Sequence, residues 1–322
     1  MASSATEHGA AAAAAPGDEL IGVLEQGRRR FLALVADIRP ELLRYCARMT
    51  GSVADGEDVV QDTLARACYE LSQMHELPPL RPWLFRIAHH RAIDHWRRES
   101  YRASEPLDEA LDVAADAALE PESTVARRQA VQAALSSFLE LAPAQRGCVI
   151  LKDVLDHSLE EIAAELNLSV PSVKAALHRG RVSLKRSVEK GAAALPRIAP
   201  ISEALRHYAR LFNAHDWEGI RALLAEDVRL DLVSQRKAAG RRAVGSYFGN
   251  YQRTAGWRVV PASCDGREVL AVLAAESDPV PRYFIELGWR HGSIASIRDF
   301  RYVSYIAQEG LFVMAEGVRT GS

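Results

Sequence analysis

Apolar residues recur with a helical period in two stretches of the first 190 positions, and an alternating strand pattern begins only after residue 200. Between residues 20 and 102 there is almost no strand pattern, and Gly and Pro interrupt the helical one at "TGSVADGED" and "HELPPLRP". A second helical stretch runs from residue 125 to residue 190 and stops at "KGAAALPRIAP". These patterns predict two all-helical units.

The last third of the chain has a different character. Two helical patterns, "ISEALRHYARLFNAHDW" and "WEGIRALLAED", give way to stretches that predict strands: "VRLDLV", "REVLAVLAAE", "RYFIELGW" and "SIASIRDFRY". "CDGRE" and "RHGSI" predict hairpin turns, because Gly266 and Gly292 adopt a positive φ at little cost. An α+β domain is therefore expected here.

The segments between these units have the composition of linkers. The Ala-rich start is predicted to be disordered, and residues 103–124 carry many Asp and Glu but no Lys or Arg. The predicted organisation is a lead (1–22), a first helical unit (23–102), an acidic linker (103–124), a second helical unit (125–190), a short linker (191–200) and a C-terminal domain (201–315).

Composition narrows the class of protein. The 322 residues are 48% hydrophobic and have a net charge of −2, so real cores are expected and any basic surface must be offset elsewhere. The four cysteines lie far apart without a CxxC pair, which favours buried, reduced thiols over disulfides or a zinc site. No signal peptide or membrane span is recognisable, so we expect a cytoplasmic protein that needs no metal or cofactor.

The segment "SLEEIAAELNLSVPSVKAALHRGRVSLKR" predicts two short helices joined by a tight turn. Ser158 and Glu161 have the spacing of a capping box, and Pro171 suits the first turn of the following helix. That helix has an apolar stripe of Val173, Ala176, Leu177, Gly180 and Leu184 and a cationic stripe of Lys174, His178, Arg181 and Lys185. This is the pattern of a helix-turn-helix whose second helix enters the major groove of DNA, although a solvated helical hairpin is the alternative.

The last helix of the first unit carries a second basic face. In "RPWLFRIAHHRAIDHWRRESYR" one stripe holds Phe85, Ala88, Ala92 and Trp96, and another holds Arg91, His95, Arg98 and Arg102. Two cationic faces joined by an acidic tether predict contact with two separated patches of DNA. His89 and His90 point to different faces of this helix, which favours packing or nucleic-acid contact over metal binding.

In these motifs the chain resembles the extracytoplasmic-function sigma factors of bacterial RNA polymerase. "GEDVVQDTLARAC" is similar to the region 2 helix that docks on the polymerase clamp, "PWLFRIAHHRAIDHWRR" to the segment that melts and reads the minus-ten element, and the helix-turn-helix to the region 4 reader of the minus-thirty-five element. The resemblance covers residues 28–190 and implies binding to core RNA polymerase, through its clamp and flap, and to promoter DNA.

The resemblance also implies roles for individual residues. It makes Asp58, Gln61 and Asp62 candidates for the clamp contact, although a solvated helix face is the alternative for these acidic residues. The residues implied in DNA binding are Arg91, Asp94, Arg97 and Arg98 at the minus-ten element, and Lys174, His178, Arg179, Arg181 and Lys185 on the recognition helix. His90 stands where the family commonly has Asn, so the minus-ten sequence that the family recognises cannot be carried over to this chain. Trp83, Phe85 and Trp96 are candidates for stacking on opened bases, with core packing as the commoner role.

The C-terminal domain resembles the SnoaL-like family, whose curved sheet and helices enclose a pocket. Asp231, Arg242, Tyr247, His291 and Asp299 are candidates for lining it, with structural hydrogen bonding as the alternative. The resemblance implies a non-enzymatic sigma factor in which this domain regulates by contacting the helical units. Two other classes stay open: a helix-turn-helix regulator that acts without polymerase, and an enzyme that uses the C-terminal domain alone. The sequence specifies no anti-sigma partner, ligand or membrane contact.

Overall fold

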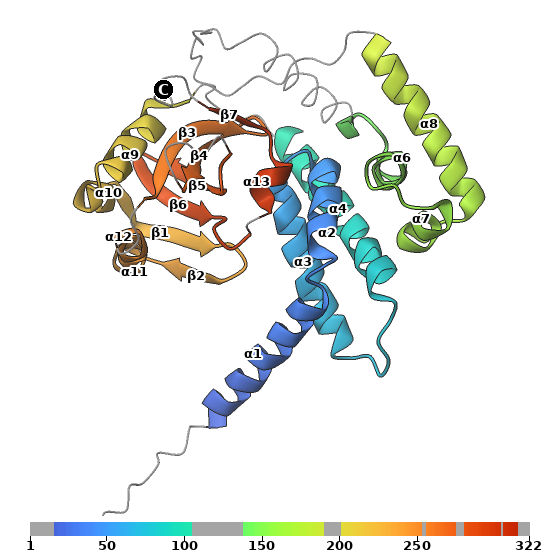
Figure 1. The fold of residues 1–322 in the computed structure, drawn as a ribbon, viewed down its shortest axis with the longest axis horizontal. Coiled ribbons are helices and arrows are strands. Elements are labelled where there is room, and N and C mark those ends of the chain that lie inside the picture. Colours follow the sequence, from blue (N-terminus) through green and yellow to red (C-terminus); the bar gives the residue numbers. More distant parts are fainter. Residues whose placement is uncertain are drawn as a thin grey trace, which may run out of the picture.

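The computed structural model describes residues 16–104, 138–189, 201–252, 256–274, 280–303 and 305–314. Two helical units and an α+β C-terminal domain are arranged side by side, with the first helical unit in the middle (Figure 1). This confirms the predicted fold class. Within the described ranges, no helix combines the length and apolar character that crossing a membrane requires.

The first helical unit consists of four helices. These are α1 (Pro16–Leu34), α2 (Arg39–Thr50), α3 (Val53–Leu71) and α4 (Leu80–Ser104). Gly51 ends α2 in a left-handed conformation, and the side chain of Ser52 caps α3 by accepting a hydrogen bond from the backbone N of Asp55. A Cβ at Gly56 would lie 2.6 Å from the backbone N of Ala47, so a glycine is needed where α2 and α3 approach each other.

Helix α1 begins at Pro16, inside the segment that the sequence predicts as a disordered lead. Proline suits the first turn of a helix, because its missing N–H would have no partner there. Helix α1 therefore overlaps residues 16–22 of the predicted lead. The rest of the lead, the acidic linker from residue 105 onward and the second linker lie outside the described residues.

The second helical unit contains the predicted helix-turn-helix. It is formed by α6 (Pro143–Val149), a π-helix η1 (Ile150–Val154), α7 (Leu159–Leu166) and α8 (Val170–Glu189). Ser158 and Glu161 form the predicted capping box, and Asn167 ends α7 with φ of 54°. A Cβ at Gly180 would meet Val149 at 2.7 Å, so this glycine lets α8 pack closely against α6.

The two helical units are in direct contact, with α7 against α4 and α6 against α2. Arg146 of α6 is 1% exposed, and its guanidinium donates to the backbone oxygen of Met49 in α2 at 2.6 Å. It also donates to the backbone oxygens of Leu139 and Leu141, at 2.6 and 3.1 Å. The buried guanidinium of the second unit thus makes one of its three hydrogen bonds to the first unit. This contact fixes the relative position of the two units.

The C-terminal domain is a curved seven-stranded sheet with helices packed against it. The strand order is β2-β1-β6-β5-β4-β3-β7, and the β1–β6 pair is parallel while the other pairs are antiparallel. The strands are β1 (Leu224–Leu232), β2 (Arg236–Ala239), β3 (Arg258–Cys264), β4 (Arg267–Leu273), β5 (Tyr283–Arg290), β6 (Ser293–Asp299) and β7 (Phe312–Met314). The helices are α9 (Glu203–Asn213), α10 (Trp217–Ala222), α11 (Arg241–Gly245), the 3-10 helix η2 (Ser246–Phe248), α12 (Gly249–Gln252) and α13 (Ile306–Glu309).

Both predicted hairpin turns are confirmed. Asp265 and Gly266 join β3 to β4, and His291 and Gly292 join β5 to β6, with all four residues at positive φ. Strand β3 was not expected, because Pro261 interrupts its alternation, yet it pairs with β4 on one side and β7 on the other.

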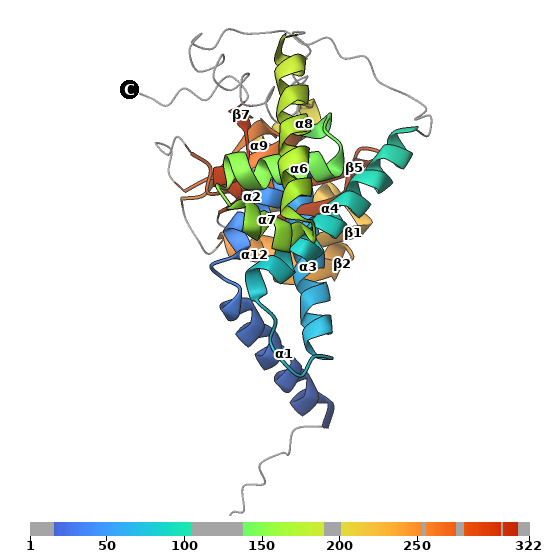
Figure 2. The same cartoon turned by 90° about the vertical axis from the view of Figure 1, so that its right-hand side faces the viewer.

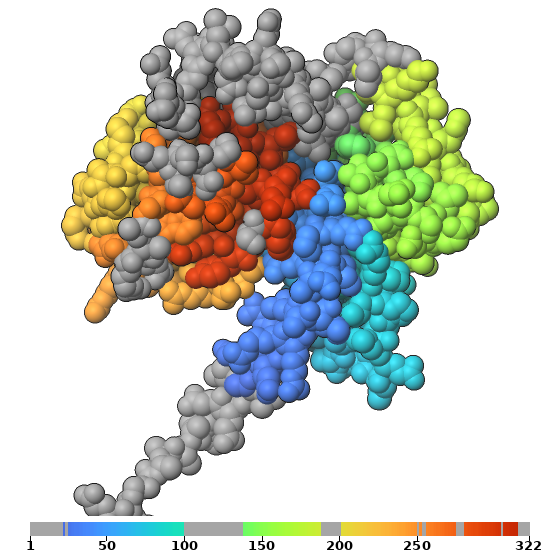
Figure 3. Space-filling view, in the orientation of Figure 1, coloured from blue at the N-terminus to red at the C-terminus, as the bar shows by residue number. Residues whose placement is uncertain are grey.

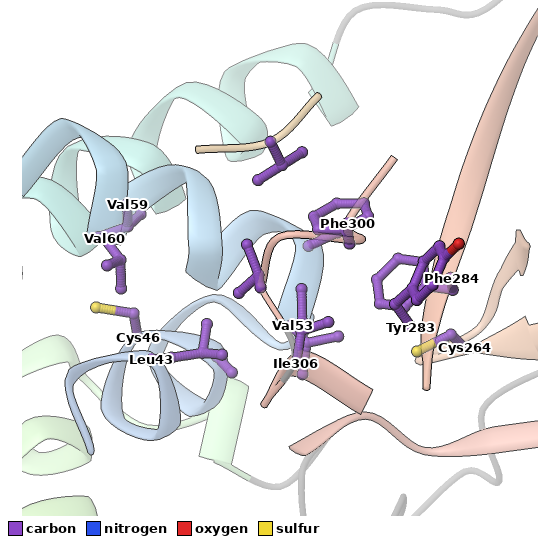
Figure 4. Packing of buried hydrophobic residues seen from close by; sticks show 14 of the residues in the cluster. Leu43, Cys46, Val53, Val59, Val60, Cys264, Tyr283, Phe284, Phe300 and Ile306 are labelled. Carbon is purple, nitrogen blue, oxygen red and sulfur yellow. The ribbon is translucent and has the colours of Figure 1, made fainter. Parts of the chain in front are cut away.

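The C-terminal domain packs against the first helical unit on the side away from the second (Figures 1, 2 and 3). Helix α13 contacts α2 and α3, and the buried side chains of the two parts form one continuous cluster. Figure 4 shows Ile306 and Phe300 of the C-terminal domain beside Val53 and Leu43 of the first helical unit. The domain is therefore docked through an apolar core as well as through the polar contacts described next.

Candidate nucleic-acid interface

Helix α8 presents the predicted cationic face to solvent. Val173, Ala176 and Leu177 are buried against the rest of the second helical unit, which orients the opposite side of the helix outward. The exposed side chains are Lys174, His178, Arg179, Arg181 and Lys185. A 480 Å³ groove beside them is lined by Lys152 of η1 as well as by Lys174, His178 and Arg181. Lys152 was not predicted, because it lies on a neighbouring helix.

Arg181 is paired within its own helical unit. The guanidinium of Arg181 holds the carboxylate of Asp153 with two hydrogen bonds, of 3.0 and 2.5 Å. Asp153 was not singled out from the sequence, and it lies 28 positions away in η1. Arg181 therefore has to exchange a carboxylate for a phosphate or base if it contacts DNA.

Helix α4 carries the second predicted surface. Arg97 and Arg98 are exposed, Asp94 is also exposed, and Arg91 lies 4.0 Å from the Asp94 carboxylate. A hollow of 300 Å³ between α3 and α4 is lined by Arg66, Glu70, Ile87, His90, Arg91 and Asp94. The hollow offers both hydrogen-bond donors and acceptors, as recognition of a nucleobase edge requires. Arg66 and Glu70 of α3 were not predicted.

The aromatic candidates on α4 divide between core and surface. Trp83 and Phe85 are 4% and 0% exposed and belong to the core, which is the alternative considered for them. Trp96 is 36% exposed, and the guanidinium carbon of Arg146 lies 5.7 Å from the centre of its ring. Of the three, Trp96 is the side chain that an incoming base can reach.

His89 and His90 have different environments, as their positions on the helix predict. His89 is buried, and its Nδ1 lies 2.7 Å from the hydroxyl of Tyr45. Burial lowers the pKa of His89 to about 4, so its ring is neutral at physiological pH. His90 is exposed, its Nδ1 lies 2.8 Å from the backbone oxygen of Arg86, and the residue lines the surface hollow.

The predicted polymerase-contact residues lie on α3. Asp62 is exposed, and Gln61 is half-buried and donates to Glu57 at 3.4 Å. Asp58 forms an ion pair with Arg298 of β6, at 2.6 Å. The structure therefore leaves Asp62 open to solvent and engages Asp58 with the C-terminal domain.

Further contacts bind the C-terminal domain to the start of α3. The β3–β4 hairpin tip reaches this helix: Asp265 accepts a hydrogen bond from the backbone N of Val53 at 2.8 Å, and Arg267 holds the Asp55 carboxylate with two bonds of 2.8 and 2.5 Å. Arg298 also pairs with Glu286 of β5 at 2.9 Å, which orients its guanidinium. Asp55 was missed in the sequence, although it shares one helix face with Asp58 and Asp62.

A buried ion pair lies at the junction between the first helical unit and the C-terminal domain. Glu57 is 0% exposed and accepts from Arg39 of α2 at 2.5 Å, while the hydroxyl of Ser234, after β1, contacts both side chains. Burial raises the pKa of Glu57 above its ordinary value, and Arg39 opposes this rise. Nearby, Arg44 and Arg48 of α2 pair with Glu309 of α13, at 2.9 and 3.3 Å. The junction is thus rich in charge at its rim.

The pocket candidates of the C-terminal domain do not converge. Asp231 pairs with Lys237 at 3.4 Å near the β1–β2 edge, and Arg242 and His291 are exposed. Tyr247 lies inside the domain and donates to Asp299. The Asp299 carboxylate also accepts from Tyr251 at 3.0 Å, and burial raises its pKa. Tyr247 and Asp299 therefore belong to a buried hydrogen-bond network, and the other candidates are surface groups.

Comparison with known families assigns all three parts of the chain. The Sigma-70 region 2 model matches residues 34–102, the Sigma-70 region 4 model matches residues 131–184, and the SnoaL-like domain model matches residues 205–301. The first and second helical units are thus sigma regions 2 and 4, in the order that the sequence motifs indicate.

The curated relatives SigG and SigF agree with these assignments. The ECF RNA polymerase sigma factor SigG of Mycobacterium tuberculosis is 31% identical over 220 residues, which make up 60% of this chain but only 58% of SigG. The ECF RNA polymerase sigma factor SigF of Caulobacter vibrioides is 31% identical over 148 residues, which make up 45% of this chain and 78% of SigF. The crystal structure of the Mycobacterium tuberculosis sigma factor SigJ aligns with 83% of this chain and 95% of SigJ, at 17% identity and a TM-score of 0.33. The chain belongs to the extracytoplasmic-function family of RNA polymerase sigma factors and carries a SnoaL-like C-terminal domain.

Proposed function

We propose that this chain directs core RNA polymerase to promoters and that its C-terminal domain restrains it by covering the polymerase-binding face of α3. The observation that carries the proposal is the ion pair between Arg298 and Asp58, since Asp58 is a proposed contact to the polymerase clamp. Arg267 and Asp265 cover the neighbouring turn of α3. One surface cannot bind two partners, so the C-terminal domain has to leave before the clamp binds.

The same proposal assigns a role to each cationic surface. Helix α4, with Arg91, Arg97 and Arg98, contacts the minus-ten strand, and helix α8, with Lys174 and His178, reads the minus-thirty-five groove. The two elements are about 25 base pairs apart, which is about 85 Å along duplex DNA. The helical units in direct contact are too close to span this distance, and a fully extended chain between residues 104 and 138 reaches about 110 to 120 Å. Separation of the two units therefore accompanies promoter binding.

The restraint is expected to be moderate. Its ion pairs are partly exposed and each contributes about 1 kcal/mol or less, so much of the contact rests on the small apolar patch around Val53 and Ile306. A short connection holds the domain at an effective concentration on the order of 1 mM. If the isolated contact had a Kd of about 0.1 mM, about one molecule in ten would be open, and apparent affinity for polymerase would fall about tenfold.

The test compares the full chain with the double variant Arg267→Gln/Arg298→Gln. Binding to core RNA polymerase and transcription from genomic promoter fragments are measured at equal concentration. The matched control is Arg210→Gln, which removes an exposed ion pair with Glu203 on α9, away from the junction. We expect about tenfold tighter polymerase binding for the double variant and no change for the control.

Three other results would redirect the assignment. Unchanged polymerase affinity in the double variant would remove the proposed restraint while leaving the sigma function intact. DNA binding without any association with core polymerase would favour a conventional helix-turn-helix regulator. Weaker polymerase binding in the double variant would mean that the C-terminal domain braces α3 rather than masking it.

A further inference from the structure

His157 lies between the two helical units, in the loop that joins η1 to α7, and it is 3% exposed. Its Nδ1 is 2.8 Å from Oε2 of Glu165, which belongs to the same unit and is 1% exposed. Its Nε2 is 2.6 Å from Oε1 of Glu41 in α2, which belongs to the first unit. The imidazole therefore bridges two carboxylates that come from different sigma regions.

Charged groups face this ring from every element around it. Arg81 of α4 pairs with Glu41, its Nε lies 3.7 Å from Glu165, and its Nη2 lies 2.9 Å from Nε2 of His157. Lys152 of η1 donates to the backbone oxygen of His157 at 2.9 Å and pairs with Asp156. Glu161 lies in the first turn of α7, and the ring of Phe85 meets the imidazole edge-on at 5.5 Å. With His157 protonated, the central group of two carboxylates, one guanidinium and one imidazolium has no net charge.

The two carboxylate contacts favour a proton on both ring nitrogens, whereas the donor Arg81 at Nε2 favours the neutral ring. A neutral imidazole has one N–H donor and one lone pair, whereas the imidazolium has two donors. Both ring nitrogens stand at hydrogen-bond distance from a carboxylate oxygen, which only accepts. In the neutral form a lone pair would face a carboxylate at 2.6 or 2.8 Å, which is repulsive.

We propose that His157 is a proton-operated latch, which in its imidazolium form ties Glu41 of the first helical unit to Glu165 of the second and releases this tie when it loses the proton. After deprotonation Nε2 retains Arg81 as a donor, but its contact with Glu41 becomes unfavourable. The pH response follows from this arrangement. Burial by itself would lower the pKa of His157, yet the hydrogen bonds to Glu165 and Glu41 outweigh burial and raise the pKa above its ordinary value.

The direction of the effect follows from the raised pKa. The stabilisation is fully present below the ordinary pKa of histidine, about 6.5, and is lost as the pH rises through the raised pKa of His157. A rise in pH therefore opens the contact between sigma regions 2 and 4. The consequence for transcription rests on the proposed function, in which the two regions separate on the promoter, but the opening itself is a structural event that can be measured without polymerase.

The experiment measures the distance between the two helical units by energy transfer in the full chain. Dyes are attached at Gln73→Cys and Glu160→Cys, two exposed positions, in a Cys68→Ser background, because the other three cysteines are buried. At constant ionic strength, the ratio of closed to open molecules should fall about tenfold or more between pH 6 and pH 9, as expected for loss of a charge-assisted hydrogen bond. His207→Gln, which removes an exposed histidine of α9, is the control and should keep this response.

Two variants and one titration decide the proposal. His157→Gln should abolish the pH response, and Glu41→Gln should keep the units closed at pH 9, because its amide can donate to the neutral ring. A pH response identical to that of the unmodified chain in both variants would overturn the latch, as would a distance that does not change with pH. If His157→Gln does not fold, an NMR titration of His157 in the full chain replaces it, and a pKa at or below 6.5 would refute the proposal.

Discussion

Arg298 of β6 reaches out of the C-terminal sheet and binds Asp58 of α3 at 2.6 Å, although the two residues are 240 positions apart. A second pair, between Arg267 and Asp55, lies one helical turn earlier on the same face of α3. Together the two arginines neutralise Asp55 and Asp58, of which Asp58 is a proposed polymerase contact. A partner that replaces the C-terminal domain has to offer positive charge of its own.

Docking of the C-terminal domain should weaken with salt. Raising the ionic strength from about 0.05 to 0.5 M screens partly exposed ion pairs such as Arg298–Asp58. The backbone N of Val53 donates to Asp265 only while the domain is docked, so its amide hydrogen should exchange severalfold faster at high salt. Exchange of the peptide that contains residues 52–58 is measured at fixed pH.

A matched variant distinguishes screening from a general loss of stability. Arg267→Gln/Arg298→Gln should exchange quickly at low salt already and should respond little to further salt. Equal protection of Val53 at both salt concentrations in the unmodified chain would mean that the apolar contact around Ile306 dominates the docking.

The recognition helix could be predicted in detail because its information is local. The capping box at Ser158, the turn at Asn167 and the two stripes of α8 each depend on residues only a few positions apart. The acidic junction could not be predicted, because Asp55 and Arg267 are 212 positions apart and no local pattern links them. The same limit applies to His157 and Glu41, which lie 116 positions apart. Local periodicity defines helices, whereas contacts between units depend on how the units pack.

The sequence could not show which of the pocket candidates converge, for a related reason. A periodic pattern identifies which residues share a face of a strand or helix, but it does not say whether that face is covered. Tyr247 and Asp299 meet inside the C-terminal domain, whereas Arg242 and His291 lie on its surface. The interior beside them is filled by the aromatic rings of Phe212, Tyr251 and Phe248. Helical periodicity alone does not predict how these rings pack against the sheet.

Substitutions along α8 should separate promoter choice from overall affinity. Replacing Lys174 or His178 by alanine, in the first half of the helix, should change the preference among minus-thirty-five sequences by about 1 to 3 kcal/mol. Replacing Lys185 or Arg186, in its last turns, should weaken binding to all promoters and reduce the salt slope by about one unit for each lost phosphate contact. Binding is measured across a promoter panel at several salt concentrations, and equal scaling of every promoter by all four changes would disprove base reading by this helix.

His89 should make the protein less stable in weak acid. Its pKa is lowered to about 4 by burial, so in the folded state the ring resists a proton that the unfolded chain accepts near pH 6.5. Stability is therefore lost as the pH falls below 6.5, by about 2 kcal/mol between pH 7 and pH 5. Chemical unfolding at the two pH values measures this loss. His89→Gln retains an acceptor for Tyr45 and should flatten the dependence, and an unchanged pH slope in this variant would assign the acid sensitivity to another group.

Arg146 should be essential for the contact between sigma regions 2 and 4. Its guanidinium is 1% exposed and donates to three backbone oxygens, of which that of Met49 belongs to the other region. Arg146→Met keeps much of the side-chain volume but leaves these buried oxygens without a donor, which costs about 3 kcal/mol or more. Arg146→Lys keeps the charge, yet one ammonium group cannot replace the planar fork, so about half of that loss should remain. The result is measured by energy transfer between Gln73→Cys and Glu160→Cys at pH 6, where the latch is closed. Arg146→Met should shift the units towards the open state, and Arg146→Lys should be intermediate. Closed units in both variants would show that the contact depends on the His157 cluster instead.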